Sequence, residues 1–473
     1  MSALQQVIPE GYKQTEIGVI PEDWTVSKLN DVSLIRVGGD VDFIAFSLEQ
    51  DSNFNYPVYS NTVDNPGVYG YYSYPEYSNT SVTVVGRGVG LGTAIVREGG
   101  FGAIGRLIVI EPQDLNEYFL ASYINEHVKI QNESSGVPQL TGIALGNKQI
   151  PVPSRTEQTS IAHALSDVDA LLSELENLIA KKQAIKTATM QQLLTGKTRL
   201  PQFAFYSDIN STEGAVEGMR KHSSATNVNA GACDEGSLAS QESVGMDSRR
   251  KGTKPSELGE IPEDWDVISI ANLTRNIIDY RGRTPKKLGL DWGGGDIVAL
   301  SAGNVKKGYI DFEEGCYLGS EELYKKWMKN GAVEKDDIVF TMEAPLGNVA
   351  LIPDTNRYIL SQRTILIQLD RELFDPSFVY QLMMSVQFQS LLSDSATGST
   401  AQGIKRARFE QLLLCLPKNI KEQTAIASIL SDMDSEIQTL EQRLSKTRQI
   451  KQGMMQELLT GRTRLPFEQA IEA

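Results

Sequence analysis

The residues best suited to chemistry in the first half of the chain form the run Gly86-Arg87-Gly88-Val89-Gly90-Leu91-Gly92. Its glycines recur every second residue, whereas the dinucleotide fingerprint is G-x-G-x-x-G and opens a helix. The residues after Gly92 are strand-like, so that fingerprint is absent. A glycine-rich loop with one arginine suits close backbone approach to a polymer, or it forms a tight hairpin, and both interpretations stay open. Candidate binding residues here are Arg87, Gly88, Gly90, Arg97 and Arg106.

Basic residues gather in the second half of the chain. The clusters are Tyr280 to Lys287, Asn304 to Lys307, Lys325-Lys326 and Lys405 to Arg408. Arg and Lys beside small residues can reach phosphate oxygens and the O6 and N7 atoms of guanine. Each cluster alone is also compatible with a solvated face, but their number favours a one-sided basic patch. The candidates are Arg281, Arg283, Thr284, Lys286, Lys287, Lys405 and Arg406.

Two further segments of the second half have the residue types of base-reading loops, Thr341 to Asn348 and Leu360 to Thr364. A glutamate can accept from N4 of cytosine, and Gln or Asn can pair with adenine. A Pro-Gly turn and a strand-end cap are the structural alternatives. The candidates are Glu343, Asn348, Gln362 and Arg363.

Motifs for catalysis by this chain are missing. Leu194 to Thr198 imitates the end of a Walker A loop, but Gln191 stands where the motif needs a glycine. Asn65-Pro66-Gly67-Val68 lacks the second proline and the aromatic residue of the adenine methyltransferase loop. The three cysteines and three histidines have no metal spacing. We therefore expect no catalytic residue, metal or cofactor on this chain.

Composition bounds the class of protein. A length of 473 residues suggests two to four domains, and 40% hydrophobic content is ordinary for a globular chain. A net charge of −15 argues, taken alone, against nucleic acid, so any DNA contact must rest on local clusters or on a basic partner. No apolar run reaches about 18 residues and Met1 to Glu10 lacks a signal pattern, which predicts a cytoplasmic protein.

A duplicated sequence block indicates which secondary-structure elements position these candidate residues. Residues 157–201 and 422–466 align without a gap at an offset of 265, with 24 of 45 positions identical. Apolar residues in both copies step by four and three, which is a heptad seam. Its members are Ile161, Leu165, Val168, Leu172, Leu175 and Ile179 in one copy, and Ile426, Leu430, Met433, Ile437, Leu440 and Leu444 in the other.

The block predicts two helices of roughly 36 residues, each about 55 Å long at ~1.5 Å per residue. Gly196 and Gly461 stand where a helix would stop. The matching phase of the two stripes favours an antiparallel coiled coil within the chain, and the alternative is a stripe buried on a globular body. After Ile179 the heptad positions are occupied by Lys182 and Lys186, so we expect the far half of each helix to pack differently from the first half. Packing against a different protein is one way in which this could occur.

A second repeat opens each half of the chain. Gly11 to Trp24 matches Gly252 to Trp265 at an offset of 241, with 9 of 14 residues identical, and Trp24 and Trp265 read as core anchors. The bodies that follow differ almost completely, although both have mixed α/β patterns. Strands are expected near 81–85, 92–96, 107–110, 296–300, 337–341, 349–352 and 364–369, and helices over Glu117 to Ile130 and Pro376 to Leu392. Ser207 to Arg250 reads as a flexible linker.

Together the duplicated motifs resemble one family, the DNA-specificity subunit of Type I restriction-modification systems. The resemblance rests on Ile-Pro-Glu-Asp-Trp at 20–24 and 261–265, on Glu-Gln-Thr at each helix start, and on Leu-Leu-Thr-Gly-Lys/Arg-Thr-Arg-Leu-Pro at each helix end. It implies two α/β target-recognition domains joined by two long conserved helices in an antiparallel coiled coil, with an internal pseudo-two-fold repeat. The expected ranges are 1–153 and 254–417 for the recognition domains, 154–201 and 418–473 for the helices, and 202–253 for the linker.

The resemblance also implies partners. Two modification subunits would dock on the helices and carry S-adenosylmethionine, and restriction subunits would carry ATP and Mg. This chain would read a bipartite double-stranded DNA target, with recognition loops at Gly86 to Gly92, Arg281 to Lys287, Met342 to Asn348 and Gln362-Arg363. Two other classes remain open: a pseudo-symmetric scaffold that binds protein or glycan, and a restriction enzyme with its own active site, which the missing motifs disfavour.

Overall fold

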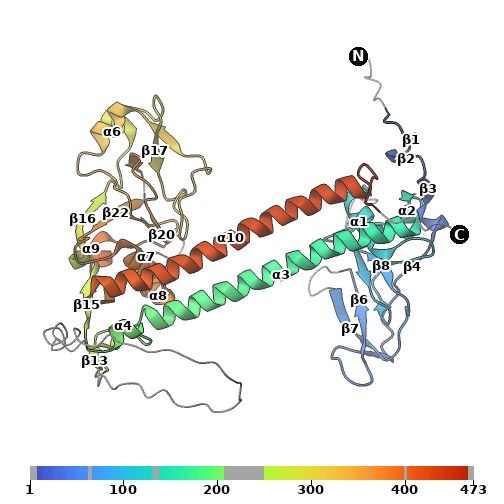
Figure 1. The fold of residues 1–473 in the computed structure, drawn as a ribbon, viewed down its shortest axis with the longest axis horizontal. Coiled ribbons are helices and arrows are strands. Elements are labelled where there is room, and N and C mark those ends of the chain that lie inside the picture. Colours follow the sequence, from blue (N-terminus) through green and yellow to red (C-terminus); the bar gives the residue numbers. More distant parts are fainter. Residues whose placement is uncertain are drawn as a thin grey trace, which may run out of the picture. The chain divides into compact units, whose positions relative to one another are not determined.

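The computed structural model describes residues 8–61, 67–130, 138–206, 250–361, 363–398 and 402–466. It divides into two compact units, one of Met1–Ile179 with Thr439–Ala473 and one of Ala180–Gln438. We call these unit 1 and unit 2. Each contains a mixed α/β body and part of each of two long helices (Figure 1). The predicted linker and the tail after Pro466 lie almost wholly outside the described residues, as does Gln362.

The long helices are α3 (Arg155–Leu193) and α10 (Ile420–Leu458), 39 residues each and thus slightly longer than predicted. Neither contains a proline, and both are followed by a glycine at φ 69°, Gly196 and Gly461. A left-handed residue at that place satisfies helix-end carbonyls and lets the chain turn away. All twelve predicted seam residues are buried or half-buried.

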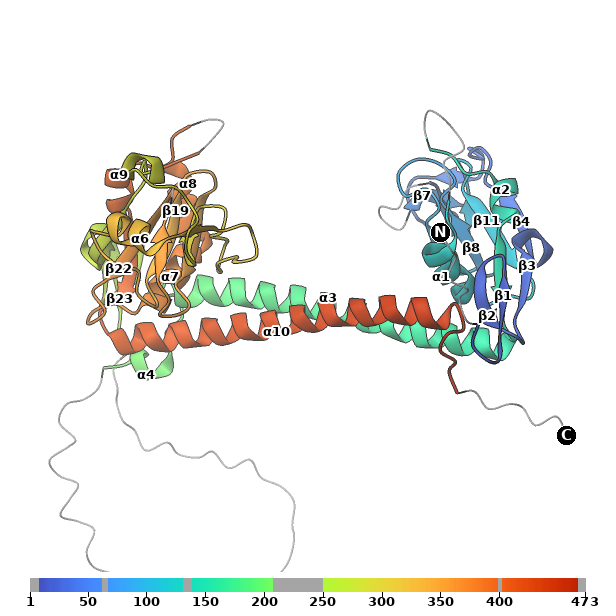
Figure 2. The ribbon, with the colours of Figure 1, turned by 90° about the horizontal axis from the view of Figure 1, so that it is seen from above.

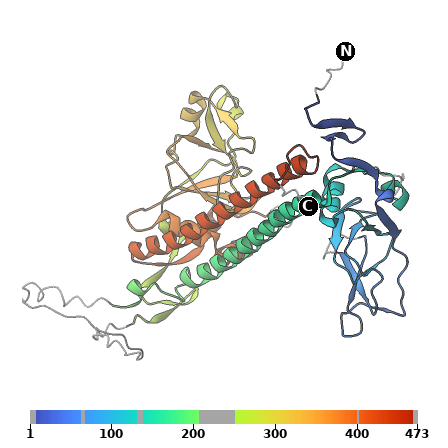
Figure 3. The same ribbon diagram turned by 45° about the vertical axis from the view of Figure 1, so that its right-hand side comes forward.

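Within each unit the two helices run antiparallel, side by side (Figure 3). In unit 2, Lys182 pairs with Glu436 and Lys186 pairs with Asp434, so residue numbers rise along one helix as they fall along the other. In unit 1, Lys451 pairs with Asp169 at 2.6 Å and Arg448 pairs with Glu176 at 2.6 Å. The lysines that interrupt the heptad pattern therefore form ion pairs with carboxylates of the other helix.

The first seam residues of each long helix do not pack against the first seam residues of the other helix. Ile161 and Leu165 share a core with Met455, Leu458 and Leu459 at the end of α10. Likewise Ile426 and Leu430 share a core with Leu193 and Leu194 at the end of α3. The prediction that the far half of each helix packs differently is confirmed, because the end of each helix packs on the start of the other helix and on a body. A different protein, the version left open, is not what buries these residues.

Unit 1 carries the following body elements: β1 (Tyr12–Thr15), β2 (Gly18–Pro21), β3 (Thr25–Lys28), η1 (Leu29–Asp31), β4 (Ser33–Val37), β5 (Phe46–Ser47), β6 (Tyr56–Tyr59), β7 (Val68–Tyr72), β8 (Ser81–Val84), β9 (Ala94–Arg97), β10 (Gly102–Ala103), β11 (Ile108–Pro112), α1 (Glu117–His127), α2 (Gly142–Gly146) and β12 (Gln149–Val152). The main sheet has the order β4-β11-β8-β9, all antiparallel, with α1 against β8 and β9 (Figure 2). A smaller sheet has the order β10-β6-β7-β5.

Unit 2 carries α4 (Pro201–Ala204), β13 (Thr253–Ser256), β14 (Gly259–Pro262), β15 (Trp265–Ser269), α5 (Ile270–Leu273), β16 (Thr274–Asp279), η3 (Pro285–Leu288), β17 (Ile297–Leu300), β18 (Tyr317–Gly319), α6 (Glu321–Trp327), β19 (Ile338–Met342), β20 (Leu346–Leu351), β21 (Tyr358–Leu360), β22 (Thr364–Leu369), α7 (Pro376–Met384), α8 (Val386–Asp394), α9 (Arg406–Glu410) and β23 (Leu413–Pro417). Its main sheet has the order β16-β22-β19-β20, and its smaller sheet β18-β17-β21.

The two bodies therefore share one strand framework although their sequences differ. Each begins with a hairpin, pairs the next strand with the last strand of the body, and sets a four-stranded antiparallel sheet beside a smaller one with a parallel pair. Trp24 and Trp265 are fully buried, as predicted for core anchors. The mixed α/β prediction is confirmed.

One predicted helix was wrong. Residues 376–392 form two helices, α7 and α8, separated at Ser385. Ser385 has an extended backbone (φ −65°, ψ 149°), and its hydroxyl accepts a hydrogen bond from the backbone N–H of Phe388. Apolar periodicity continues across such a break, and a serine that caps the next turn ends the first helix.

Candidate nucleic-acid interface

The predicted binding segments of each body meet at one end of its main sheet. In unit 1, strand register places Val37, Ile108, Val84 and Ala94 in one row across β4, β11, β8 and β9. In unit 2, the row is Asp279, Ile365, Phe340 and Val349 across β16, β22, β19 and β20. We call the end of the sheet beyond each row the sheet edge. The loops that leave or enter the strands at this edge contain most of the predicted residues.

In unit 1 the glycine-rich loop crosses the sheet edge. Gly86 donates to Asn61 Oδ1 (2.8 Å), and its carbonyl accepts from Leu140 N (2.9 Å). Gly88, Gly90 and Gly92 all have φ between 81° and 88°, and a Cβ at Gly92 would lie 2.6 Å from Ile130. Glycine is therefore required for this path. Arg87 is exposed, and Val89 beside it is 88% exposed.

A pocket of about 360 Å³ opens beside that loop in unit 1. Arg106, Gln139 and Thr141 line it together with the apolar side chains of Ile35, Val37 and Ile143. Ile143 is 76% exposed and Val37 is 48% exposed. This part of the edge combines one arginine with apolar surface of the kind that contacts thymine methyl groups in DNA complexes.

In unit 2 the sheet edge is charged. The backbone N–H of Met342 donates to the carbonyl of Arg363 (2.9 Å), and the carbonyl of Met342 accepts from Ile404 N (3.1 Å). Glu343 and Gly403 form an isolated antiparallel β-bridge through their backbones. Arg281 lies at the same edge, where it donates to both carboxylate oxygens of Asp279, to Oδ1 at 3.0 Å and to Oδ2 at 2.7 Å. Burial would raise the pKa of Asp279, but hydrogen bonds from Arg281 outweigh it and Arg406 acts in the same direction, so the pKa lies below its ordinary value. The pKa of Arg281 is raised by its hydrogen bonds to Asp279 and, to a smaller extent, by the charge of Glu343.

Several predicted side chains are engaged inside their own unit. Arg97 is 6% exposed, with its guanidinium carbon 3.9 Å from the ring centroid of Tyr59, and burial lowers its pKa. Arg283 donates to the carbonyl of Trp327 (2.7 Å), and Asn348 donates to that of Val305 (2.8 Å). Thr284 and Lys287 form internal bonds around η3. The remaining predictions, Lys286, Lys405 and Arg406, are exposed, and Arg406 pairs with Glu410 at 2.7 Å.

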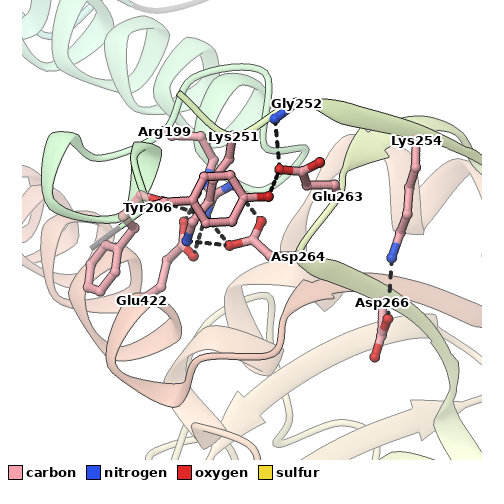
Figure 4. A network of polar contacts seen from close by, with 10 residues as sticks. Arg199, Tyr206, Lys251, Gly252, Lys254, Glu263, Asp264, Asp266 and Glu422 are labelled. Atoms are coloured by element: carbon pink, nitrogen blue, oxygen red, sulfur yellow. Dashed lines mark hydrogen bonds and ion pairs between the residues drawn. The ribbon is translucent and has the colours of Figure 1, made fainter. Parts of the chain in front are cut away.

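In each unit a network of ion pairs, which the sequence did not lead us to predict, joins the body to both long helices. In unit 2, Arg199 donates to Glu422 (2.6 Å and 2.7 Å) and to Asp264 (2.8 Å and 3.0 Å), and Lys251 joins at Asp264 (2.8 Å), as Figure 4 shows. In unit 1, Arg464 makes the equivalent bonds to Glu157 and Asp23, at 2.8–2.9 Å. The arginine that follows the end of one long helix thus binds the glutamate that begins the other.

The two carboxylates of the unit 2 network differ in environment. Burial raises the pKa of Glu422, which is 1% exposed, in spite of its bonds to Arg199. Burial also opposes ionisation of Asp264, but the bonds from Arg199 and Lys251 together outweigh it and lower its pKa. The difference follows from exposure and from the second cation. The sequence did contain a sign of this network, since the arginine, the glutamate and the aspartate each occur at the same position in both repeats.

Comparison with known proteins agrees with the duplicated plan. The family described as "Type I restriction modification DNA specificity domain" matches residues 21–187 and 262–449. The chain belongs to this family. The family match occurs once in each half and includes each body after its opening hairpin, with most of one long helix.

Relatives of this specificity family span nearly the whole chain. The Type I restriction enzyme MjaVIII specificity subunit of Methanocaldococcus jannaschii is 22% identical over 477 residues, covering 96% of both chains. The putative MjaX specificity subunit of the same organism is 23% identical over 491 residues, covering 98% of this chain and 99% of the relative. The crystal structure of the Type I system S subunit from M. genitalium aligns with a TM-score of 0.54 at 12% identity, over 92% of this chain and 96% of that one.

The named relatives are specificity subunits, and a specificity chain of this family is not itself an enzyme. Within the described ranges, no group of three or more His, Cys, Asp or Glu side chains is placed to hold a metal ion. None of the helices in the described part of the chain has the length and apolar character needed to cross a bilayer.

Proposed function

We propose that this chain gives a Type I restriction-modification complex its DNA sequence specificity, with each body reading one half of a two-part target in double-stranded DNA. One observation carries the proposal. The same strand framework occurs twice, and its two sheet edges present different side chains at matching backbone positions.

Hydrogen bonds identify those matching positions. The carbonyl of Gly86 accepts from Leu140 as the carbonyl of Met342 accepts from Ile404. The next residue is Arg87 in unit 1 and Glu343 in unit 2. Arginine reads guanine, whereas glutamate accepts from cytosine, so the two edges suit different bases on a common scaffold.

The segment that opens α2 or α9 shows the same contrast. Thr141 and Ile143 of unit 1 correspond to Lys405 and Ala407 of unit 2, because each set directly follows the matched residues Leu140 and Ile404. A constant frame with exchanged edge residues is what a reader of two unlike half-sites needs. A scaffold whose two bodies bind the same partner has no such requirement.

The long helices supply a surface that would bind two copies of one partner. Ile185 and Ile450 occupy the same position in the two repeats, 265 residues apart, and are 42% and 49% exposed. Lys181 with Lys446, and Gln191 with Gln456, are likewise identical and exposed. Single exposed apolar side chains are common on protein surfaces, but a pair at equivalent positions of the two helices suits two identical modification subunits that dock there.

In this proposal the chemistry belongs to the partners. Modification subunits would bind S-adenosylmethionine and methylate adenine, and restriction subunits would bind ATP and Mg for cleavage. The complex would act in the cytoplasm. Basic modification subunits would also provide phosphate neutralisation that a chain of net charge −15 lacks.

Mapping adenine methylation in the genome of the host, with and without this gene, tests the proposal. We expect one two-part adenine motif to be methylated with the gene and unmethylated without it. An unchanged set of methylated motifs would contradict the proposal. Co-purified modification subunits without a lost motif would favour a scaffold role instead.

A further inference from the structure

Two arginines occupy the same position in the two otherwise unlike bodies. Arg106 stands two residues before Ile108 of β11, and Arg363 stands two residues before Ile365 of β22. Ile108 and Ile365 have the same place in the row across the main sheet, each paired with the strand that leads into the Arg87 or Glu343 loop. The offset between the two arginines is 257 (363 − 106), which matches neither sequence repeat.

Both arginines have a backbone conformation that disfavours them. Arg106 has φ 68° and Arg363 has φ 66°, and only two other non-glycine residues in the described part of the chain have positive φ. Each backbone is fixed at the sheet edge, since Arg106 N donates to Gly38 O (3.0 Å) and Arg363 O accepts from Met342 N (2.9 Å). Glycine adopts this conformation without a Cβ penalty, so an arginine here indicates a use for its side chain.

The side chains of both residues are free to be used. Both are exposed, and neither forms an ion pair or a side-chain hydrogen bond with any residue that the structure describes. The neighbouring Arg281 and Arg283, by contrast, are held by Asp279 and by the carbonyl of Trp327. A guanidinium without an internal partner at the sheet edge is available to a ligand.

The contrast with adjacent positions points to the kind of ligand. Arg87 is replaced by Glu343 and Thr141 by Lys405 at the matching places, as expected where unlike bases are read. The arginine is the same in both bodies, and the group common to any two half-sites is the phosphate backbone. We infer that Arg106 and Arg363 bind a DNA backbone phosphate at equivalent places in the two half-sites and do not select bases.

This inference rests on the proposed function, and its test uses the complex of the full chain with its modification subunits. The variants are Arg106→Gly, Arg363→Gly and the double substitution. Glycine keeps the left-handed backbone, so the thermal midpoint should stay equal or rise while the guanidinium is lost. Arg275→Ala is the control, because Arg275 is 59% exposed and lies at the other end of β16.

Binding to a target duplex and to an unrelated duplex is then measured over a range of salt concentrations. Each single variant should lose about tenfold in affinity for both duplexes, and the slope of log Kobs against log salt should fall by about 0.9. The ratio between the two duplexes and the methylated motif should not change. Arg106→Lys should retain most of the binding, because a phosphate accepts any cation whereas bidentate guanine recognition prefers the guanidinium.

Other outcomes separate the possible failures. A variant that changes the methylated motif would make its arginine a base reader and overturn the inference. So would an unchanged salt slope, or an equal loss in Arg275→Ala. If the unsubstituted complex does not distinguish the target from the unrelated duplex, the proposed function itself fails, whatever the variants do.

Discussion

Arg199 lies just beyond the end of α3, yet its guanidinium binds Glu422 in the first turn of α10, with Nε 2.6 Å from Oε1. Its other face binds Asp264 of the repeated Ile-Pro-Glu-Asp-Trp motif. A single side chain therefore joins the end of one helix, the start of the other and the base of a body, all within unit 2. Arg464 does the same in unit 1.

Removing Arg199 should destabilise unit 2 strongly. Arg199→Ala leaves Glu422 buried without its cation, a situation that costs about 3–5 kcal/mol. Arg464→Ala should cost less, because Glu157 is equally buried but still accepts a hydrogen bond from Trp24 Nε1 (2.9 Å), whereas the indole N–H of Trp265 has no partner among the described residues of unit 2. Urea unfolding of the full chain measures both. The control Lys254→Ala breaks a half-exposed pair with Asp266 and should change stability by about 0–1 kcal/mol. A larger loss for Arg464→Ala than for Arg199→Ala would contradict this ranking.

The glycine after each long helix should tolerate no side chain. Gly196 has φ 69°, and a Cβ there would lie 2.5 Å from Pro262. We expect Gly196→Ala to lower stability by more than about 1 kcal/mol. Gly453→Ala is the matched control, since Gly453 lies inside α10 with no atom within 4 Å of the added carbon. That change should raise stability by about 1 kcal/mol. Equal effects of both substitutions in thermal unfolding would show that the contact with Pro262 is unimportant.

The pH dependence of stability should reveal the Asp264 contact. Because its pKa is lowered in the folded chain, Asp264 stabilises the fold above its ordinary pKa of about 3.9, and this contribution is lost as pH falls through the lower folded value. The stability difference between the natural chain and Asp264→Asn should therefore be largest near neutral pH and shrink below about pH 4. Denaturant midpoints of both proteins at pH 7, 4 and 3.5 provide the measurement. A difference that grows with acid would have the wrong sign.

The isoleucines on the long helices should control the number of bound modification subunits. Ile185→Asp puts a charge into the proposed contact and should weaken docking of one copy by about tenfold or more, and Ile450→Asp should act on the other copy. Native mass spectrometry of the complex counts the copies. Ile44→Asp is the control, because Ile44 is 95% exposed on the body of unit 1. Two retained copies in the double variant would place the docking surface elsewhere.

The repeats explain how much of the fold was predictable. Trp24 and Trp265, the seam residues and the stop at Gly196 and Gly461 each follow from local pattern. The break at Ser385 does not, because apolar spacing continues through it. The burial of Arg97 depends on Tyr59, which is distant in sequence. Spacing alone gives no sign of such a contact.

The sheet edge could be predicted only in part. Sequence reasoning found the loops that contain Arg87, Arg281, Glu343 and Arg363, because glycine and basic residues mark them. It did not pair Arg106 with Arg363, because the only pattern that the two sites share, Arg-x-Ile-x-Ile at 106–110 and 363–367, is short and lies at an offset that matches neither repeat. Strand register supplied that equivalence, through Ile108 and Ile365.

Exchanging one body tests most directly whether each body reads its own half-site. In the exchanged chain, a second copy of residues 26–153 replaces residues 267–417, so that both bodies have the sequence of the first. This chain should direct adenine methylation to a target in which the half-site read by unit 1 occurs twice and the other half-site is absent. Genome-wide methylation mapping of a host that expresses this chain gives the target. If the half-site assigned to residues 267–417 is still methylated after those residues are removed, the bodies do not read DNA separately.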